Sequence, residues 1–196
     1  MAETTERTRR EVRLRWVALL VFGVAFGYVE AAVVHYLRRL IGVGAGYQVG
    51  AGTVHLDLGF IKFVSPQRAV LIDPGLVGVE TAREAATLVM LVAVAVMAGG
   101  PLRRRVAAFF IAFAVWDLTY YAFLRVLDGW PSSLATLDVY FLIPVTWVGP
   151  VATPVVASSV ALVVASWAFL ADPRTRRASR PGRRVRSGAE ATEVRR

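Results

Sequence analysis

The sequence predicts an all-α membrane protein, a bundle of four transmembrane helices with both termini in the cytoplasm. Of its 196 residues, 56% are hydrophobic and 19% are charged, whereas an average soluble domain is about 45–50% apolar and about 25% charged. Four stretches of the chain are apolar over about 20 residues, the length that crosses a bilayer. The positive charge lies mainly at the two ends of the chain, outside these stretches.

The predicted spans divide residues 16–170 into a membrane domain. The first span contains Glu30 and His35, the second is polar only in its first turns, the third contains Asp117, and the fourth has no charge. Their ranges are about 16–37, 79–98, 106–124 and 151–170. A cleaved signal peptide is not favoured for the first, because its apolar run is longer than the usual 7–15 residues or so.

Charge gives the predicted orientation. Residues 1–15 hold five arginines against three glutamates, and residues 171–196 hold nine arginines against three acidic residues, within a net charge of +9. Cytoplasmic flanks collect Lys and Arg, and Arg103 to Arg105 lie on the same predicted side. We therefore expect both termini on the cytoplasmic side of the membrane. The Arg-rich tail, 171–196, should be disordered and contact anionic lipid headgroups, not nucleic acid.

Two outer segments, 38–78 and 125–150, join the spans. In the first, 54–64 alternates in part, which predicts a short hairpin or a segment lying on the bilayer, and Asp73-Pro74-Gly75 predicts a turn. In the second, Ser132 and Ser133 predict the cap of a short helix over 134–143. Prolines 144, 150 and 154 then predict a break before the fourth span. Three tryptophans near span ends are expected at the membrane interface: Trp16, Trp130 and Trp147.

Glu30 is the first of the charges that are expensive in lipid, each costing about 2.5–3.5 kcal/mol at a helix centre. Gly23 and Gly27 lie on the same helical face as Glu30. Small residues four apart let helices approach closely. Glu30 is therefore expected to face another helix.

The second span begins with a polar group. Glu80, Glu84 and Thr87 share a face, and Arg83 lies about 60° from it. Arg83 is a candidate cation that keeps two or three carboxylates ionised in a medium of low dielectric constant.

The third span places Asp117 and Tyr121 on one stripe, flanked by Tyr120, so that tyrosine hydroxyls can donate hydrogen bonds to the acid. Asp138 lies on the predicted short outer helix. At about 1.5 Å per residue, four segments each send an acid into the outer half of the membrane: Glu30, Glu84, Asp117 and Asp138.

Three hypotheses account for these charges. The first is a purely structural salt-bridge cluster around Arg83, in an accessory or scaffold subunit. The second is a cation or proton site. The third is a metal-assisted membrane enzyme with Glu30, Glu84, Asp117 and Asp138 as ligands or acid–base groups, although the Glu-x-x-His pair of di-iron bundles is absent.

Other chemistry is excluded or not indicated. The chain has no cysteine, which excludes disulfides and zinc-thiolate sites. Phosphate-binding loops and the common hydrolase motifs are absent. Ser158 and Ser159 have no nearby base in sequence and are expected to form hydrogen bonds between helices. His35 is expected to be a satisfied interfacial residue, and His55 with Asp57 only a weak surface metal pair.

Several stretches resemble a family of small bacterial membrane proteins that has no assigned activity. The resemblance covers about half of the chain. It is carried by FGYVEAAVV from Phe26, REAATLVML from Arg83, Trp116-Asp117 with Tyr120-Tyr121, and GWPSSL from Gly129 through Asp138 to Val151. In that family the position of His35 is usually apolar and that of Thr146 often proline. The resemblance implies a multi-pass protein of a bacterial cytoplasmic membrane but no mechanism. Its motifs include Glu30, Arg83, Glu84, Asp117 and Asp138.

These observations predict a polar site in the outer half of the bilayer. Its candidate residues are Glu30, Arg83, Glu84, Asp117 and Asp138, with Tyr120 and Tyr121 as donors. We expect it to bind a cation or a small polar ligand from the extracytoplasmic side; a bound metal ion is a possible cofactor. The inner halves of the spans are apolar, which argues against transport by a monomer. A homo-oligomer or a partner membrane subunit remains open.

Overall fold

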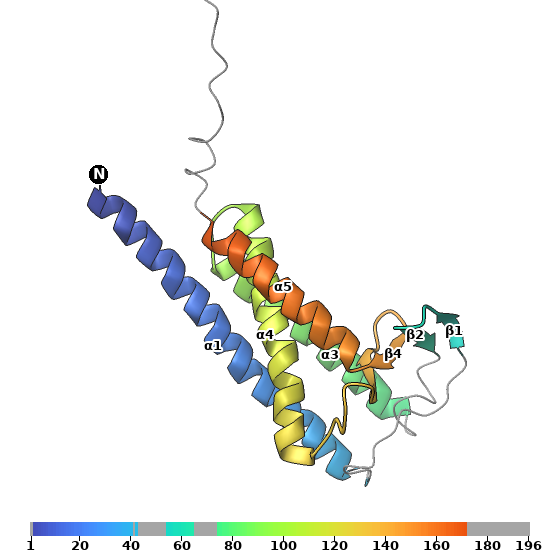
Figure 1. Ribbon diagram of the computed structural model, residues 1–196. Helices are drawn as coiled ribbons and strands as arrows, with labels where there is room; N and C mark the ends of the chain where they lie inside the picture. Colours follow the sequence, from blue (N-terminus) through green and yellow to red (C-terminus); the bar gives the residue numbers. More distant parts are fainter. Residues whose placement is uncertain (1, 41, 43–53, 65–73, 172–196) are drawn as a thin grey trace, which may run out of the picture.

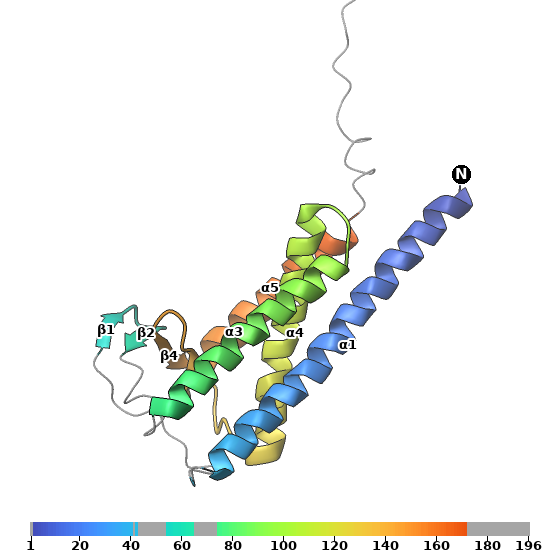
Figure 2. The same cartoon turned by 180° about the vertical axis from the view of Figure 1, so that it is seen from behind.

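The computed structural model describes residues 2–40, 42, 54–64 and 74–171. Its long elements are helices, with bounds α1 (Ala2–Leu40), α3 (Pro74–Met97), α4 (Leu102–Asp128) and α5 (Ala152–Leu170). Helices α1 and α4 run in one direction and α3 and α5 in the other (Figure 1). The N-terminus of α1 and the C-terminus of α5 therefore lie toward the same end of the molecule, as Figure 2 also shows from behind. The predicted tail lies outside the described residues.

Three of these helices, α1, α4 and α5, are long and apolar enough to cross a membrane, which supports the membrane class. Helix α3 has 24 residues, but Glu80, Arg83 and Glu84 interrupt its apolar run. A fourth span is therefore not established by length and composition. Helix α3 begins at Pro74, where a turn was predicted. Proline is well tolerated in the first turn of a helix.

Helix α4 is the centre of the helical body and packs against α1, α3 and α5. At the end near the chain termini, alanines alternate with large side chains in one buried cluster that includes Leu91, Ile111 and Phe169. The contact between α1 and α4 is close at Gly23 and Gly27. A Cβ on Gly23 would lie 2.7 Å from the Val115 Cβ, so the predicted helix–helix contact through these glycines is confirmed.

A four-stranded antiparallel sheet covers the opposite end (Figure 1). Its strands lie in the order β1-β2-β4-β3, with bounds β1 (Val54–Asp57), β2 (Lys62–Val64), β3 (Leu137–Phe141) and β4 (Thr146–Pro150). Lys62 is opposite Val148, and Val148 is opposite Val139. The sheet thus joins two segments far apart in sequence. The predicted hairpin within 54–64 is confirmed, with Asp57 Oδ1 accepting the Gly59 N–H at 2.8 Å in its turn.

The predicted short helix over 134–143 is wrong, because this segment contains strand β3. The serines expected to cap it instead stabilise a turn. The Ser133 N–H donates to Thr136 Oγ1 at 3.1 Å, and Ser132 Oγ lies 3.1 Å from the same atom. The β-branched and aromatic residues that follow pair with β4, a tertiary interaction that outweighs the local capping signal.

Trp130 was expected at the membrane interface, and this expectation is wrong. Its side chain is only 3% exposed, so it is not an interfacial anchor. The guanidinium of Arg38 lies 4.2 Å from its ring centroid. Trp16, expected at the interface, donates its indole N–H to Ser166 Oγ on α5 at 3.0 Å.

Candidate functional site

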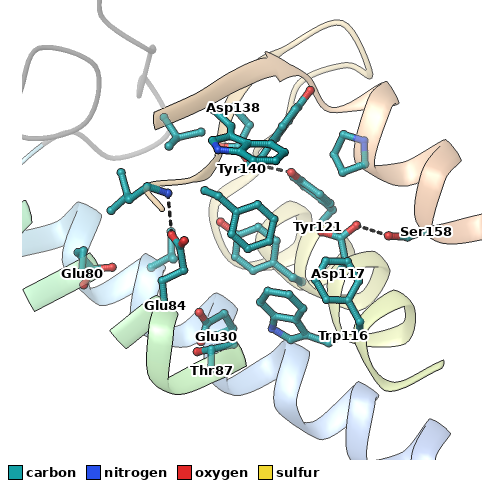
Figure 3. A pocket seen from close by; sticks show the side chains of 18 of the residues that line it. Glu30, Glu80, Glu84, Thr87, Trp116, Asp117, Tyr121, Asp138, Tyr140 and Ser158 are labelled. Carbon is teal, nitrogen blue, oxygen red and sulfur yellow. Dashed lines mark hydrogen bonds between the residues drawn. The ribbon is translucent and has the colours of Figure 1, made fainter. Parts of the chain in front are cut away.

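A cavity of about 300 Å³, which we call the chamber, lies where the sheet meets the helices (Figure 3). Its walls come from α1, α3, α4, α5, β3, β4 and the hairpin residue Ile61. All seven residues predicted as site candidates line it: Glu30, Arg83, Glu84, Asp117, Tyr120, Tyr121 and Asp138. The expectation that four segments bring acids to one level therefore agrees with the geometry.

Arg83 on α3 forms ion pairs with two carboxylates. It contacts Glu30 of α1 through Nη1, and its Nη2 lies 2.7 Å from Glu80 Oε2. Glu30 is 7% exposed. Glu80 also lines the chamber but was not among the candidate residues, although its place on the Glu84 face was a signal for it. On this side of the chamber one fixed cation lies between two acids and offsets the charge of one of them.

Glu84 has different partners from those expected. Its Oε2 accepts the Leu142 N–H at 2.8 Å (Figure 3). Its Oε1 accepts the Ile143 N–H at 3.3 Å. Both amides belong to the connection between β3 and β4. The carboxylate therefore fastens the sheet to α3, and a direct contact with Arg83 is not what holds it.

Asp117 and Asp138 are both held by hydroxyl groups. Ser158 on α5 donates to Asp117 Oδ2 at 2.8 Å, and Tyr121 on α4 donates to Asp138 Oδ2 at 2.8 Å (Figure 3). Ser158 thus links two helices as predicted, whereas Ser159 bonds to Val155 within its own helix. Tyr121 was expected to donate to Asp117 and instead connects α4 to the sheet.

Burial governs the acidity of Asp138, which is 4% exposed. Removal from water raises its pKa to about 6, against the opposing effects of the Tyr121 hydroxyl, the charge of Arg38 and the Val139 N–H. Asp117 is close enough for its charge to add to the rise in this pKa. Tyr140, from the same strand, donates to the Pro150 carbonyl at 2.6 Å, and burial raises its pKa to about 12.

A second polar cluster, beside the chamber, was missed. His35 Nδ1 lies 2.6 Å from Asp128 Oδ1, and Arg38 Nη1 lies 3.4 Å from Asp128 Oδ2. Arg38 was expected in the outer segment, but it belongs to α1, is 4% exposed and lines the chamber. Its spacing of eight residues from Glu30 was a signal; nothing in the sequence pointed to Asp128.

Aromatic rings form a wall of the chamber. Phe113 lies 5.3 Å from Trp116 and 6.3 Å from Phe141, between ring centroids, and Phe141 lies 6.1 Å from Trp147. Among the described residues, the indole nitrogens of Trp116 and Trp147 are buried and have no hydrogen-bond partner. The wall therefore offers π faces to the chamber, whereas these two indole nitrogens are closed off from the open volume.

The acids do not converge as a metal site would require. In the ranges that the structure describes, no three His, Asp or Glu side chains form a group that could hold a metal ion. Glu30 and Glu80 instead share Arg83, and each of the other three chamber acids has its own hydrogen-bond donors on another element. The arrangement therefore suits the recognition of charge by individual carboxylates better than ligation of a metal pair.

Comparison with known proteins adds no assignment. No family model, curated protein or solved structure matches the chain.

Proposed function

We propose that the protein is a multi-pass membrane protein that binds a small cation or a small polar ligand in the chamber. One observation carries the proposal: the chamber is lined by five carboxylates against two arginines. The acids are Glu30, Glu80, Glu84, Asp117 and Asp138. A cavity with this charge surplus and an aromatic wall attracts cations.

The proposed orientation places the chamber on the extracytoplasmic side of a bacterial cytoplasmic membrane. The basic residues of 7–15 and of 103–105 lie at the helix ends opposite the sheet, and such residues mark the cytoplasmic side. Helix α3, which contains most of the predicted second span, is proposed to cross the membrane with α1, α4 and α5. Its charged residues line the chamber, while exposed Val89, Val92 and Val96 present an apolar surface suited to lipid.

A purely structural salt-bridge cluster is the main alternative, and the ion pairs of Arg83 are its support. A cluster that serves only packing has no need of an open volume, because interiors close to near crystal density. The chamber leaves about 300 Å³. We therefore favour binding. The helices pack closely at the end away from the sheet. This packing supports a chamber that a ligand enters from one side only, and it argues against transport by a monomer. A metal-assisted enzyme is the remaining alternative.

Thermal denaturation of the full-length protein in detergent tests the proposal. Chlorides of sodium, calcium and small alkylammonium ions are compared with neutral diols. We expect a saturable rise in Tm with at least one cation or diol, because a ligand that binds only the folded state stabilises it. The rise should be lost in Asp117→Asn and kept in Asp57→Asn, which removes an exposed carboxylate in β1 outside the chamber.

Two results would count against binding. If no compound raises the Tm while Asp117→Asn lowers it, the structural alternative is favoured. An equal loss of the ligand effect in Asp57→Asn would place binding outside the chamber.

A further inference from the structure

The hairpin formed by residues 54–64 exposes large apolar side chains. Four of them, which we call the hairpin patch, are between 48% and 57% exposed: Val54, Leu56, Leu58 and Phe60. Strand β1 is an edge strand of the sheet, and all four of its residues are exposed. Apolar side chains gathered on an exposed surface mark contact sites for membranes or proteins. The patch therefore indicates a partner.

The charge of the hairpin indicates what kind of partner this is. Asp57 and Lys62 form an ion pair, with 2.9 Å between Oδ2 and Nζ. The other residues of 54–64 are uncharged at neutral pH, with histidine neutral. The hairpin thus has no net charge to complement, so the partner is recognised through apolar surface and not through anionic or cationic groups.

The tip of the hairpin is held at the beginning of α5. Thr153, in the first turn of α5, donates its hydroxyl to the Phe60 carbonyl oxygen at 3.2 Å. The same oxygen lies so close to β4 that a Cβ on Gly149 would come within 2.5 Å of it. The depth of Phe60 in a membrane therefore follows from the depth of the first turn of α5.

The length of α5 gives that depth. The helix has 19 residues and no charged side chain. At about 1.5 Å per residue it is about 28 Å long, close to the hydrocarbon thickness of about 30 Å. When α5 crosses the membrane, its first turn therefore lies at one edge of the hydrocarbon, and Phe60 lies at the same level.

Helix α4 marks the same two levels with charged residues. At the end away from the sheet, Arg103 donates to the carbonyl of Ala168, near the end of α5. At the sheet end, Leu124 precedes Arg125 and packs in one buried cluster with Val151, just before α5. The apolar parts of the two helices therefore end at the same levels.

The hairpin lies beside the helical body. Figures 1 and 2 both show β1 and β2 to the side of α3 and α5, and not stacked beyond the ends of α1 and α4. A hairpin in this place projects over the lipids that surround the bundle. Its level and its lateral position thus select lipid as the partner.

We propose that the hairpin patch inserts into the lipid leaflet at the sheet end, with Leu58 and Phe60 at the edge of the hydrocarbon. Transfer of their apolar surface out of water stabilises the insertion. This inference rests on α5 crossing the membrane and is independent of ligand binding in the chamber. Ile61, which follows the tip, lines the chamber, so the inserted hairpin also fixes one chamber wall at the membrane surface.

Spin labelling tests the insertion in the full-length protein, reconstituted in vesicles of phosphatidylcholine. The chain has no cysteine, so one introduced cysteine carries one nitroxide label. Collision rates of the label are measured with molecular oxygen, which concentrates in hydrocarbon, and with a nickel chelate, which stays in water. Leu58→Cys and Phe60→Cys are the test sites.

Two exposed sites give the reference values. Val163→Cys, in the middle of α5 and 70% exposed, is the lipid reference. Glu6→Cys, in the exposed first part of α1, is the water reference. We expect the ratio of oxygen to nickel collisions at both test sites to lie well above the Glu6 value and toward the Val163 value.

The other results would overturn the inference. A ratio equal to that at Glu6 would place the hairpin in water. Low collision rates with both reagents would place the patch in a protein contact, such as one with a second copy of the chain. A water-like ratio at Val163 would overturn the membrane crossing on which the inference rests. A test-site ratio that rises only when phosphatidylglycerol is added would show binding through charge.

A pair of substitutions assigns the insertion to the tip. With the label on Leu56→Cys as reporter, Leu58→Ser combined with Phe60→Ser should shift the collision ratio toward the water value. Leu102→Ser is the matched control, because it removes a leucine that is 76% exposed at the opposite end of the helices. It should leave the reporter unchanged. An unchanged reporter in the double variant would contradict the proposed role of Leu58 and Phe60.

Discussion

The two ends of the helical body use the same four helices in opposite ways. Near the chain termini, alanines such as Ala108 and Ala112 let the helices close around Leu91 and Phe169 without charged groups in that cluster. At the sheet end, five acids and two arginines surround the chamber. Small apolar residues close one end of the bundle, whereas the other end encloses the chamber, where each acid has a particular partner.

The largest expected effect is at the ion pairs that hold the chamber together. Arg83→Leu leaves Glu30 and Glu80 without their cation, and breaking a buried pair costs about 3–5 kcal/mol. Denaturant unfolding in detergent measures the loss. Adding Glu30→Gln and Glu80→Gln to Arg83→Leu should recover part of the stability.

Arg39→Leu is the matched control, because Arg39 is an exposed residue of the last turn of α1. It should change stability little. An equal loss in both variants would mean that the charge itself, and not the buried pair, is responsible.

The next largest effect is the pH dependence of stability, which arises at the chamber end. The folded protein holds the Asp138 proton up to about pH 6, whereas the unfolded chain releases it near its ordinary pKa of 3.8. Between these values the folded state binds more protons, so stability falls as pH rises through the window. At about 1.4 kcal/mol per unit, the full fall from Asp138 is about 3 kcal/mol.

Asp138→Asn should flatten this dependence, measured as Tm against pH from 4 to 7. Asp57→Asn should leave it unchanged, because the Gly59 N–H and Lys62 hold the pKa of Asp57 below its ordinary value, outside the window. A slope unaffected by Asp138→Asn would contradict the assignment.

The smallest effect concerns the seam between α1 and α4, which runs from one end toward the other. In Gly27→Ala the new Cβ would overlap the Thr119 hydroxyl and lie 2.9 Å from the Trp116 carbonyl oxygen. Overpacking of this kind costs about 1–3 kcal/mol. Gly78→Ala on α3 meets nothing within 4 Å, so it should be neutral or slightly stabilising; Tm values of the two variants decide, and equal losses would argue against a close seam.

Much of the helical layout could be predicted from the sequence, because apolar length and small-residue spacing are local signals. The Gly23 and Gly27 face and the inward position of Glu30 followed from helical periodicity alone. Strand β3 could not be predicted in the same way. Its pairing with β4 and the placement of the 54–64 hairpin beside them depend on contacts between distant segments.

Most charged residues of the candidate site could be predicted, although Glu80 and Arg38 were missed, and the pairing of the acids could not be predicted. Charge in an apolar span is costly wherever it points, so Glu30, Glu84 and Asp117 could be singled out. The partner of each acid depends on tertiary geometry. The serine, tyrosine and backbone donors to Asp117, Asp138 and Glu84 lie on other elements, and no spacing within one helix encodes them.

Two arginines at the end opposite the chamber carry more than charge. Arg15 donates to the Ala98 carbonyl at 3.0 Å, just beyond α3, and Arg103 donates to the Ala168 carbonyl of α5 at 2.9 Å. Lysine would preserve the charge but not the planar, multi-donor guanidinium. Under the proposed orientation, the same side chains direct membrane insertion and join neighbouring helix ends. Substitutions chosen to reverse the orientation of the protein would therefore also weaken the contacts between helices at this end.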